Sequence, residues 1–252
     1  MNDAPPAKQV PASLMLSSRR RTFADEPFGA VLHDPTPLCH PASVPYLRRT
    51  YLYPRSGRAS AHCGPERKME YGVAGQPDYK GRGAKAGAYT SFVFNELLPH
   101  IHETYNVPSF KEKSFAGFSM GGLSAFDIVW NHSYEFANVG VFSGSLWWRS
   151  KGYMEDYDDN KHRIMHQNIK NGEFYPWLKF FFECGILDEK ADRNHNGVID
   201  AIDDTLDLIK ELKKKGYAEA SIKYLELEDG KHDVPTWARA FPNFLEWGWP
   251  KM

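Results

Sequence analysis

Residues 115 to 122 read Phe115-Ala116-Gly117-Phe118-Ser119-Met120-Gly121-Gly122, which contains a Gly-x-Ser-x-Gly motif. In this motif a strand turns sharply into a helix, and only glycine neighbours leave room for the strained serine. Apolar residues then recur at helical spacing, at Leu123, Phe126, Val129 and Trp130. We therefore expect Ser119 to be a nucleophile and the Met120 N–H to point at a developing oxyanion. A glycine-rich turn without chemistry is the alternative.

The rest of the chain after Arg67 alternates short apolar runs with helical patterns. Strands are expected before Ser119 and around residues 139–142, 178–182 and 222–227, and helices around 163–169, 204–215 and after Pro235. Alternation of this kind predicts an α/β fold, in which a mainly parallel sheet has helices on both faces.

Three residues of complementary chemistry each follow a predicted strand. They are Ser119, Asp188 and His232, and functional groups of open α/β sheets gather beyond these strand ends. Their order along the chain is the one that α/β-hydrolases use. His232 would act as general base on Ser119, and Asp188 would orient the imidazole. Two alternatives remain open: His232 could simply hold a turn, and Glu183 and Asp192 are rival carboxylates.

Two aromatic residues, Trp147 and Trp148, follow the strand expected at 139–142. Aromatic faces stack on flat or pyranose substrates, so this pair could line a substrate pocket. Packing in the core is the alternative, and it is the better explanation for at least one of the two.

The segment from Asp192 to Asp203 has the spacing of a calcium-binding loop. Its oxygen-bearing side chains are Asp192, Asn194, Asn196, Asp200 and Asp203, while Gly197 allows the sharp turn and Val198 offers a carbonyl. The loop resembles the calcium loop of dockerins. We expect a structural Ca²⁺ ion here; the alternative is a turn that caps the helix beginning near Asp204. No organic cofactor is indicated.

Composition limits the possible partners. A net charge of −1 and a pI of 6.8 give no field for holding nucleic acid. No apolar run approaches the ~20 residues that span a bilayer, so a small molecule is the expected partner. The cysteines Cys39, Cys63 and Cys184 cannot all pair, which favours free thiols. The start of the chain lacks an apolar signal core. It predicts a cytoplasmic protein as written, or a periplasmic or secreted one if the true N-terminus is missing.

Residues 1 to 66 differ from the rest, with 10 of the 17 prolines and seven arginines against one lysine. Only Tyr46 to Tyr53 has the pattern of a strand, so we expect the segment to be mostly irregular and separate from a domain at 67–252. It could be a proline-rich extension, a targeting segment or a misread gene start.

Four ordered motifs resemble the esterase D / enterochelin-esterase-like family. They are Gly117 to Gly122, Phe142-Ser143-Gly144-Ser145, Cys184 to Asp188, and Gly230-Lys231-His232-Asp233 with Trp237. The resemblance covers about Arg67 to Trp249. It implies an α/β-hydrolase fold, hydrolysis of carboxylic esters through an acyl-serine, and a triad of Ser119, Asp188 and His232.

The resemblance extends to one more segment and fails upstream. Arg67-x-x-Glu70 looks like a segment of siderophore esterases in which the arginine faces the substrate; a structural salt bridge is the alternative. Family members also carry upstream strands and a His-Gly loop with a second oxyanion donor, and residues 1 to 66 show neither pattern. An acyltransferase of the same fold or a non-catalytic binding protein therefore remain alternatives to a serine esterase.

Overall fold

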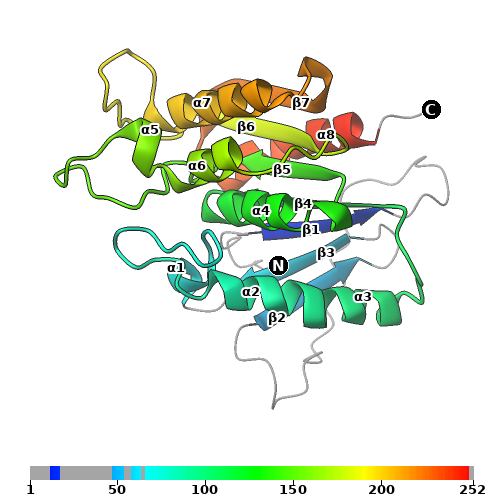
Figure 1. Cartoon of the computed structure of the whole chain (residues 1–252). Helices are drawn as coiled ribbons and strands as arrows, with labels where there is room; N and C mark the ends of the chain where they lie inside the picture. The colour runs from blue at the N-terminus through cyan, green and yellow to red at the C-terminus, as the bar shows by residue number, and fades with distance from the viewer. Residues whose placement is uncertain (1–11, 18–46, 54–57, 64–65, 250–252) are drawn as a thin grey trace, which may run out of the picture.

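The computed structural model describes residues 12–17, 47–53, 58–63 and 66–249, with side chains from Glu66 onward (Figure 1). A single seven-stranded sheet runs through this part of the chain in the order β2-β3-β1-β4-β5-β6-β7. The four parallel strands are β4 (Glu112–Phe118), β5 (Asn138–Phe142), β6 (Lys179–Leu187) and β7 (Ile222–Lys231). The predicted α/β fold with its parallel sheet is confirmed.

The other three strands come from the segment that we expected to be mostly irregular. They are β1 (Ala12–Ser17), β2 (Leu47–Tyr53) and β3 (Arg58–Cys63), and all pair antiparallel. Only β2 matches the strand expected at 46–53, so the prediction was wrong for β1 and β3. β1 has its hydrogen-bonding partner far away in the sequence, with Leu14 opposite Phe115 of β4. Apart from Glu66, the rest of residues 1–66 lies outside the described residues.

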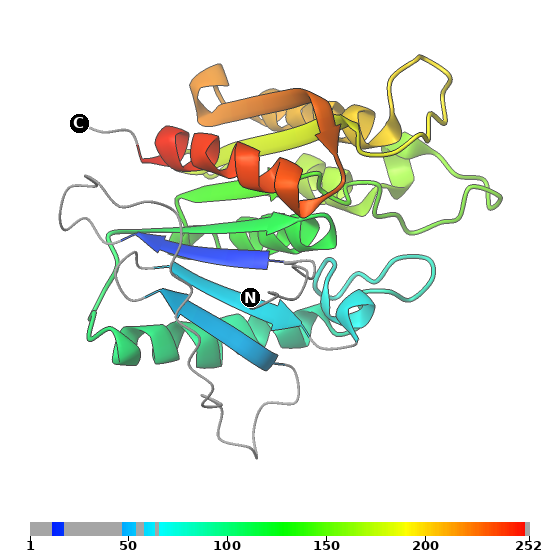
Figure 2. The ribbon, with the colours of Figure 1, turned by 180° about the vertical axis from the view of Figure 1, so that it is seen from behind.

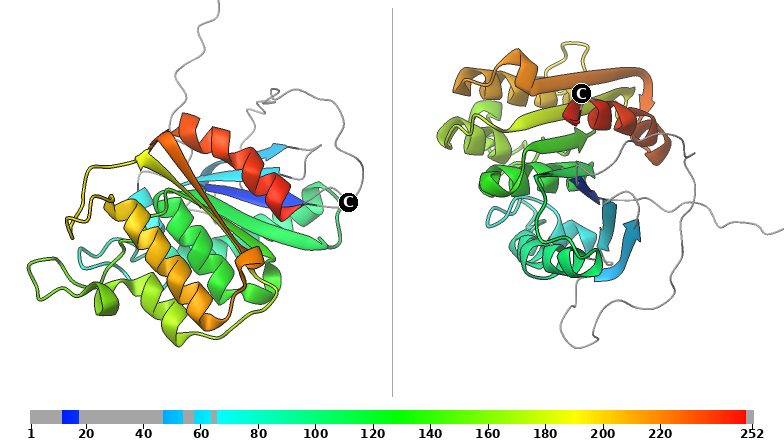
Figure 3. Two further views of the ribbon diagram at one scale, coloured as in Figure 1. Left: turned by 90° about the horizontal axis from the view of Figure 1, so that it is seen from above. Right: turned by 90° about the vertical axis from the view of Figure 1, so that its right-hand side faces the viewer.

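Helices cover both faces of the sheet. One face carries α2 (Ala86–Phe92), α3 (Leu98–Thr104), α4 (Met120–Asn131), α6 (Ile164–Asn171) and α7 (Asp200–Lys215), while α8 (Val234–Gly248) crosses the other (Figures 2 and 3). The short helices are α1 (Arg67–Glu70), α5 (Asp159–His162) and the 3-10 turns η2 (Ser133–Glu135) and η3 (Glu219–Ser221). No helix of the described residues is long and apolar enough to cross a bilayer.

A π-helical turn, η1 (Val93–Leu97), joins α2 to α3 directly before Pro99. Proline has no N–H to donate and crowds the preceding turn, and a wider turn is one way to accommodate it. The three helical segments α2, η1 and α3 therefore follow one another without a break in the chain, and α2 and α3 lie in one row in Figure 1.

Successive side chains of a strand point to opposite faces of the sheet, so the core has two layers, one on each face. Phe180 and Phe182 of β6 pack toward α4, whereas Phe181 packs beneath α8, as the period of two requires. Helix α4 is buried from Met120 to Trp130, because it lies between the sheet and the other helices. Burial on both faces explains why the inner strands β5 and β6 are largely apolar, whereas β7 at the edge of the sheet is mostly polar.

Candidate active site

Ser119 lies in the sharp turn between β4 and α4. Its backbone has φ +56° and ψ −126°, a conformation that residues with a side chain rarely adopt. Backbone hydrogen bonds hold the turn: Ser119 N donates to Phe142 O (2.9 Å), and Gly122 N, Ser145 N and Leu123 N donate to Ser119 O (2.9, 3.1 and 3.2 Å). A Cβ on Gly117 would overlap the carbonyl of Gly121, so glycine is required there. These features are those expected of a nucleophile elbow.

Met120, the expected oxyanion donor, is the first residue of α4. A backbone N–H in the first turn of a helix has no acceptor within the helix, and the helix dipole favours negative charge at this end. Sequence analysis finds no pattern for a second donor in residues 1–66, of which 1–11, 18–46, 54–57 and 64–65 lie outside the described part of the chain.

The carboxyl ends of three parallel strands bring the predicted triad to one cleft. Asp188 follows β6 and His232 follows β7, and both line the cleft together with Ser119. The distance from His232 Nδ1 to Asp188 Oδ1 is 4.0 Å. Catalytic hydrogen bonds without substrate are often this long and tighten in the complex. Asp188 is therefore the carboxylate placed beside the histidine.

Burial sets the protonation of this pair. It lowers the pKa of His232, an effect that the charge of Asp188 opposes and that of Arg67 reinforces. A neutral imidazole at neutral pH is the form that a general base needs. Burial also raises the pKa of Asp188, whereas the Ser143 hydroxyl and the Gly185 N–H lower it. The Gly185 N–H donates to Asp188 Oδ2 (3.2 Å).

The rival carboxylates, Glu183 and Asp192, are not among the residues that line the cleft. Glu183 is 1% exposed within β6, and both of its carboxyl oxygens are buried without a hydrogen-bond partner. Burial and the charge of Asp188 raise the pKa of Glu183 to about 8, so it is neutral at pH 7. Asp192 accepts hydrogen bonds from the N–H groups of Asn196 and Gly197 in its own loop.

The cleft has a volume of about 300 Å³, at the low end for small-molecule sites. Its lining residues come from six segments of the chain: Arg67, Ser119, Met120, Ser143, Gly144, Ser145, Trp147, Asp188, Glu189, Ala201 and His232. The cleft residues that follow β4, β5, β6 and β7 lie at the carboxyl ends of these strands. The loops before α5 and α7 extend on the left of Figure 1. The cleft therefore lies where the ends of parallel strands predict a site.

Arg67 and Glu70 of α1, expected together at the substrate, occupy different environments. Arg67 lines the cleft, and its Nε is buried without a hydrogen-bond partner. Glu70 is 3% exposed and is not among the cleft residues. No ion pair joins the two among the described residues, so their salt bridge is also not formed. Arg67 is held at the cleft because the backbone after α1 is bound to α4, where Gly72 N donates to Ser124 Oγ (2.9 Å).

Trp147 and Trp148 also occupy different environments, one at the cleft and one in the core. Trp147 lines the cleft and lies beneath the guanidinium of Arg82, 4.7 Å from its ring centre. Trp148 is fully buried in the core, where its indole N–H donates to Gln76 O (3.1 Å). A Cβ on Gly72 would lie 2.7 Å from this ring, which shows how closely the backbone approaches it. Trp148 therefore has the core role that we considered for one of the two.

In the expected calcium loop, some of the predicted ligand side chains contact one another. Asp203 Oδ2 accepts from the side-chain amides of Asn194 and Asn196 (both 2.9 Å). Asp200 instead accepts from the backbone N–H of Arg193 (2.9 Å) and faces its guanidinium (3.2 Å). Among the residues described, no three His, Cys, Asp or Glu side chains are grouped as a metal site.

The oxygen donors of this loop suit Ca²⁺ in kind, since carboxylates, amide oxygens and a carbonyl are the ligands it takes. Asp192, Asn194, Asn196 and Asp203 face the same loop, and Val198 follows with its N–H on Asn196 Oδ1 (2.8 Å). Calcium binding here stays a prediction. The helix that follows begins at Asp200, so the last ligands belong to its first turn.

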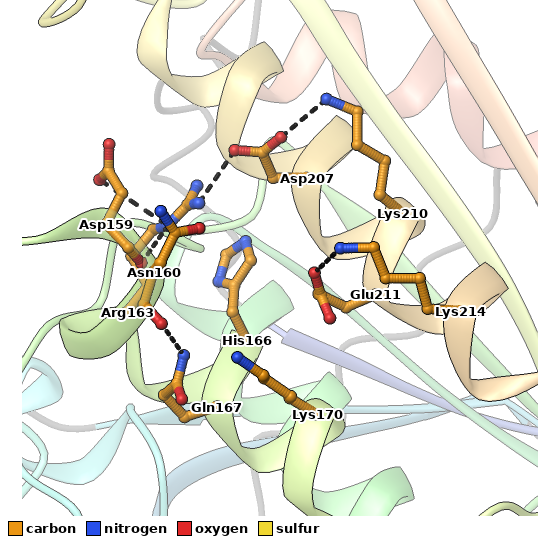
Figure 4. Close-up of a pocket in the computed structure, with 10 residues that line it drawn as sticks. All are labelled: Asp159, Asn160, Arg163, His166, Gln167, Lys170, Asp207, Lys210, Glu211 and Lys214. Carbon is orange, nitrogen blue, oxygen red and sulfur yellow. Dashed lines mark hydrogen bonds and ion pairs between the residues drawn. The ribbon is translucent and has the colours of Figure 1, made fainter.

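A second pocket, of about 110 Å³, lies between α6 and α7 (Figure 4). Arg163 at its base is 5% exposed and pairs with Asp204 (2.8 Å) and Asp207 (2.9 Å). Asp204 is shared with Arg193 of the loop after β6 (2.6 Å). The pocket is therefore lined by an ion-pair network that connects α6, α7 and the loop carrying Asp188.

Sequence reasoning assigned no role to several cleft residues, among them Ser143 and Glu189. Ser143 lies directly after β5 with φ +45°, and its Oγ accepts a hydrogen bond from the indole N–H of Trp237 (2.8 Å). Glu189, next to Asp188, has a buried Oε1 without a hydrogen-bond partner. The rule that found Asp188, a polar residue just past a parallel strand, would also have found Ser143.

Comparison with known proteins shows a match to one family model, described as putative esterase, over residues 53–247. The match begins upstream of Arg67 and so includes β3.

Solved structures show the same fold at low sequence identity. The siderophore hydrolase EstB from Aspergillus nidulans aligns with a TM-score of 0.55 and 15% identity, over 78% of this chain and 73% of that one. An IroE-like serine hydrolase from Shewanella oneidensis aligns with a TM-score of 0.51 and 16% identity, over 73% of this chain and 57% of that one. The enterochelin esterase from Shigella flexneri aligns with a TM-score of 0.50 and 24% identity, over 64% of this chain and 37% of that one. This chain thus spans well under two thirds of several of the structures it matches.

Proposed function

The chain belongs to the putative esterase family, and we propose that it is a serine esterase that cleaves carboxylic esters through an acyl-serine intermediate. The observation that carries the proposal is one cleft that holds a strained serine, a histidine and a buried carboxylate. The positive φ of Ser119 supports it most, because backbone strain of this kind persists where function requires it.

In the proposed reaction, His232 accepts the proton of Ser119 Oγ while the oxygen attacks the carbonyl carbon of the ester. The negative charge that develops on the carbonyl oxygen is stabilised by the Met120 N–H at the start of α4. His232 then passes its proton to the departing alcohol, leaving an acyl group on Ser119. Water, deprotonated by His232, repeats the attack and releases the acid.

Two side chains of the cleft bear on the choice of ester. Arg67 offers a buried, unpartnered Nε–H and a positive charge, and Trp147 offers an aromatic face. These groups suit an ester with an aromatic or anionic part, because guanidinium binds anions and indole stacks on flat rings. Siderophore-like esters have this character, and small esters would also fit a cleft of about 300 Å³.

Hydrolysis of p-nitrophenyl acetate by the wild type and by Ser119→Ala tests the proposal. We expect the variant to lose nearly the whole enzymatic rate, since the members of a triad act as a unit. Its thermal midpoint should stay close to that of the wild type, because Ser119 faces the cleft. A folded Ser119→Ala protein with most of its activity would refute the serine mechanism, and an inactive wild type would favour a binding role.

A further inference from the structure

Trp237, in the first turns of α8, contacts His232 itself and a residue near each of the other two proposed triad residues, Ser119 and Asp188. Its indole ring is stacked on Phe118, the residue before Ser119, with 5.1 Å between ring centres and 6° between planes. The same ring packs edge to face against the imidazole of His232, with 5.1 Å between ring centres and 86° between planes. A single rigid ring therefore fixes the imidazole relative to the elbow.

The chain around His232 is itself anchored to the start of α8. The side chain of Asp233 accepts from Thr236 N (3.0 Å), and Thr236 Oγ1 accepts from Lys231 N (3.0 Å). Both neighbours of His232 are thus tied to the turn that precedes Trp237. The backbone and the ring of the histidine are held by the same helix end.

The indole nitrogen adds a polar link to the acid. Trp237 Nε1–H donates to Ser143 Oγ at 2.8 Å, and this hydrogen bond is buried. A hydroxyl that accepts in this way keeps its own proton free for another acceptor. The adjacent acceptor is the carboxyl of Asp188, whose Oδ1 is buried without a hydrogen-bond partner and whose pKa the Ser143 hydroxyl lowers.

We propose that Trp237 is a positioning residue that sets the geometry of the acid and the base together. Its ring orients His232, and its N–H fixes the Ser143 hydroxyl so that this hydroxyl donates to Asp188. The inference rests on the proposed serine-esterase function and adds to it two residues, Trp237 and Ser143, that do not touch the reacting atoms.

A tryptophan that only fills the core would behave differently. Trp237 is 5% exposed and belongs to an apolar cluster with Phe118 and Phe244, so packing alone is the competing explanation. Phenylalanine keeps an aromatic ring at this position and removes the N–H. Trp237→Phe therefore separates the two roles, and Ser143→Ala removes the other partner of the same hydrogen bond.

The test measures kcat and KM for p-nitrophenyl acetate in Trp237→Phe, Ser143→Ala and the double variant. We expect each single variant to lower kcat about 10-fold, the range that follows from leaving a buried polar group unpaired, with little change in KM. The double variant should lose no more than the more impaired single variant, because both changes break one link. Trp247→Phe, in the same helix and partly buried, is the matched control and should retain wild-type kcat.

The pH profile gives a readout that packing would not move. Without the Ser143 hydroxyl the pKa of Asp188 rises, so the first protonation of the Asp188–His232 pair occurs at higher pH. The acid limb of kcat/KM should move to higher pH in Ser143→Ala and in Trp237→Phe, and stay in place in Trp247→Phe.

Wild-type kcat in Trp237→Phe, or losses that multiply in the double variant, would overturn the proposal while Ser119→Ala remains inactive. If Trp237→Phe does not fold, an unshifted acid limb in Ser143→Ala overturns it instead. Failure of the serine-esterase function itself would appear separately, as hydrolysis that survives Ser119→Ala.

Discussion

The glycine before Ser119 shows how strongly one position constrains the elbow. In Gly117→Ala the new methyl group would overlap the carbonyl of Gly121, and backbone has little freedom to move. We expect the free energy of unfolding to fall by about 1 to 3 kcal/mol, the usual cost of overpacking, and esterase activity to fall with it. Urea unfolding measures the first effect.

Gly87→Ala is the matched control for that substitution. Gly87 lies in α2 with open space where its Cβ would be, and alanine favours a helix. This variant should gain about 0.4 to 1 kcal/mol of stability. Equal stability of Gly117→Ala and the wild type would mean that the elbow is looser than described.

Glu183 predicts a pH dependence of stability. Its pKa is about 8 in the folded protein and about 4.5 when solvated, so between these values the folded state binds the extra proton. The free energy of unfolding should therefore fall as the pH rises from about 4.5 to about 8 and then level off. Glu183→Gln, which stays neutral, should remove this part of the decline.

Urea unfolding of the wild type and Glu183→Gln at pH 5, 7 and 9 measures the difference. The exposed Glu228 of β7 provides a control, since Glu228→Gln should leave the slope unchanged. A decline of the same size in Glu183→Gln and the wild type would show that Glu183 is not the group responsible.

At the residue scale, local pattern was enough to predict that three residues would lie at one cleft, while their catalytic roles stay a prediction. Ser119 was predicted from its glycine neighbours, and Asp188 and His232 from the strands they follow. The hydrogen bond between Trp237 and Ser143 joins residues 94 apart in the sequence, and only tertiary packing brings them together. Likewise, nothing in two adjacent tryptophans tells which one faces the cleft.

At the element scale, the loop from Asp192 to Asp203 leads into α7 and carries the calcium prediction. Calcium at 100 times its dissociation constant would add about 2.7 kcal/mol of stability. For a chain of this size that is an increase of about 5 to 10 °C in the melting midpoint. We expect this increase with Ca²⁺ at about 1 mM relative to EGTA, and its loss in Asp203→Asn.

Equal midpoints in Ca²⁺ and EGTA, with no heat of binding by calorimetry, would reduce the loop to a helix cap. The ion pairs of Arg193 with Asp200 (3.2 Å) and Asp204 (2.6 Å) provide the physical basis for that outcome. They already neutralise part of the negative charge that calcium would otherwise relieve.

The strands differ in how well their own sequences predict them. The second half of β4, β5 and the middle of β6 are largely apolar and buried, so their composition identifies them. β1 and β3 are rich in alanine and serine, with sequences Ala-Ser-Leu-Met-Leu-Ser and Arg-Ala-Ser-Ala-His-Cys. Their strand form depends on pairing with β4 and with each other, which local propensity does not contain.

At the scale of the whole molecule, the antiparallel strands β2, β3 and β1 extend the parallel sheet beyond β4 (Figure 1). The elbow strand is therefore internal to the sheet, with β1 on one side and β5 on the other. Placing Ser119 after an internal strand surrounds it with structure. The loops after β5, β6 and β7 supply most of the remaining cleft residues, and Arg67 of α1 and Ala201 of α7 complete the lining.

Covalent trapping of the nucleophile tests the central claim most directly. A fluorophosphonate probe reacts with an activated serine and releases fluoride, and it leaves a phosphonyl group whose mass can be located by peptide mapping. The account predicts one adduct per chain, on Ser119, with no labelling of Ser119→Ala and slowed labelling of His232→Ala. An adduct on another residue, or labelling that persists in Ser119→Ala, would contradict it.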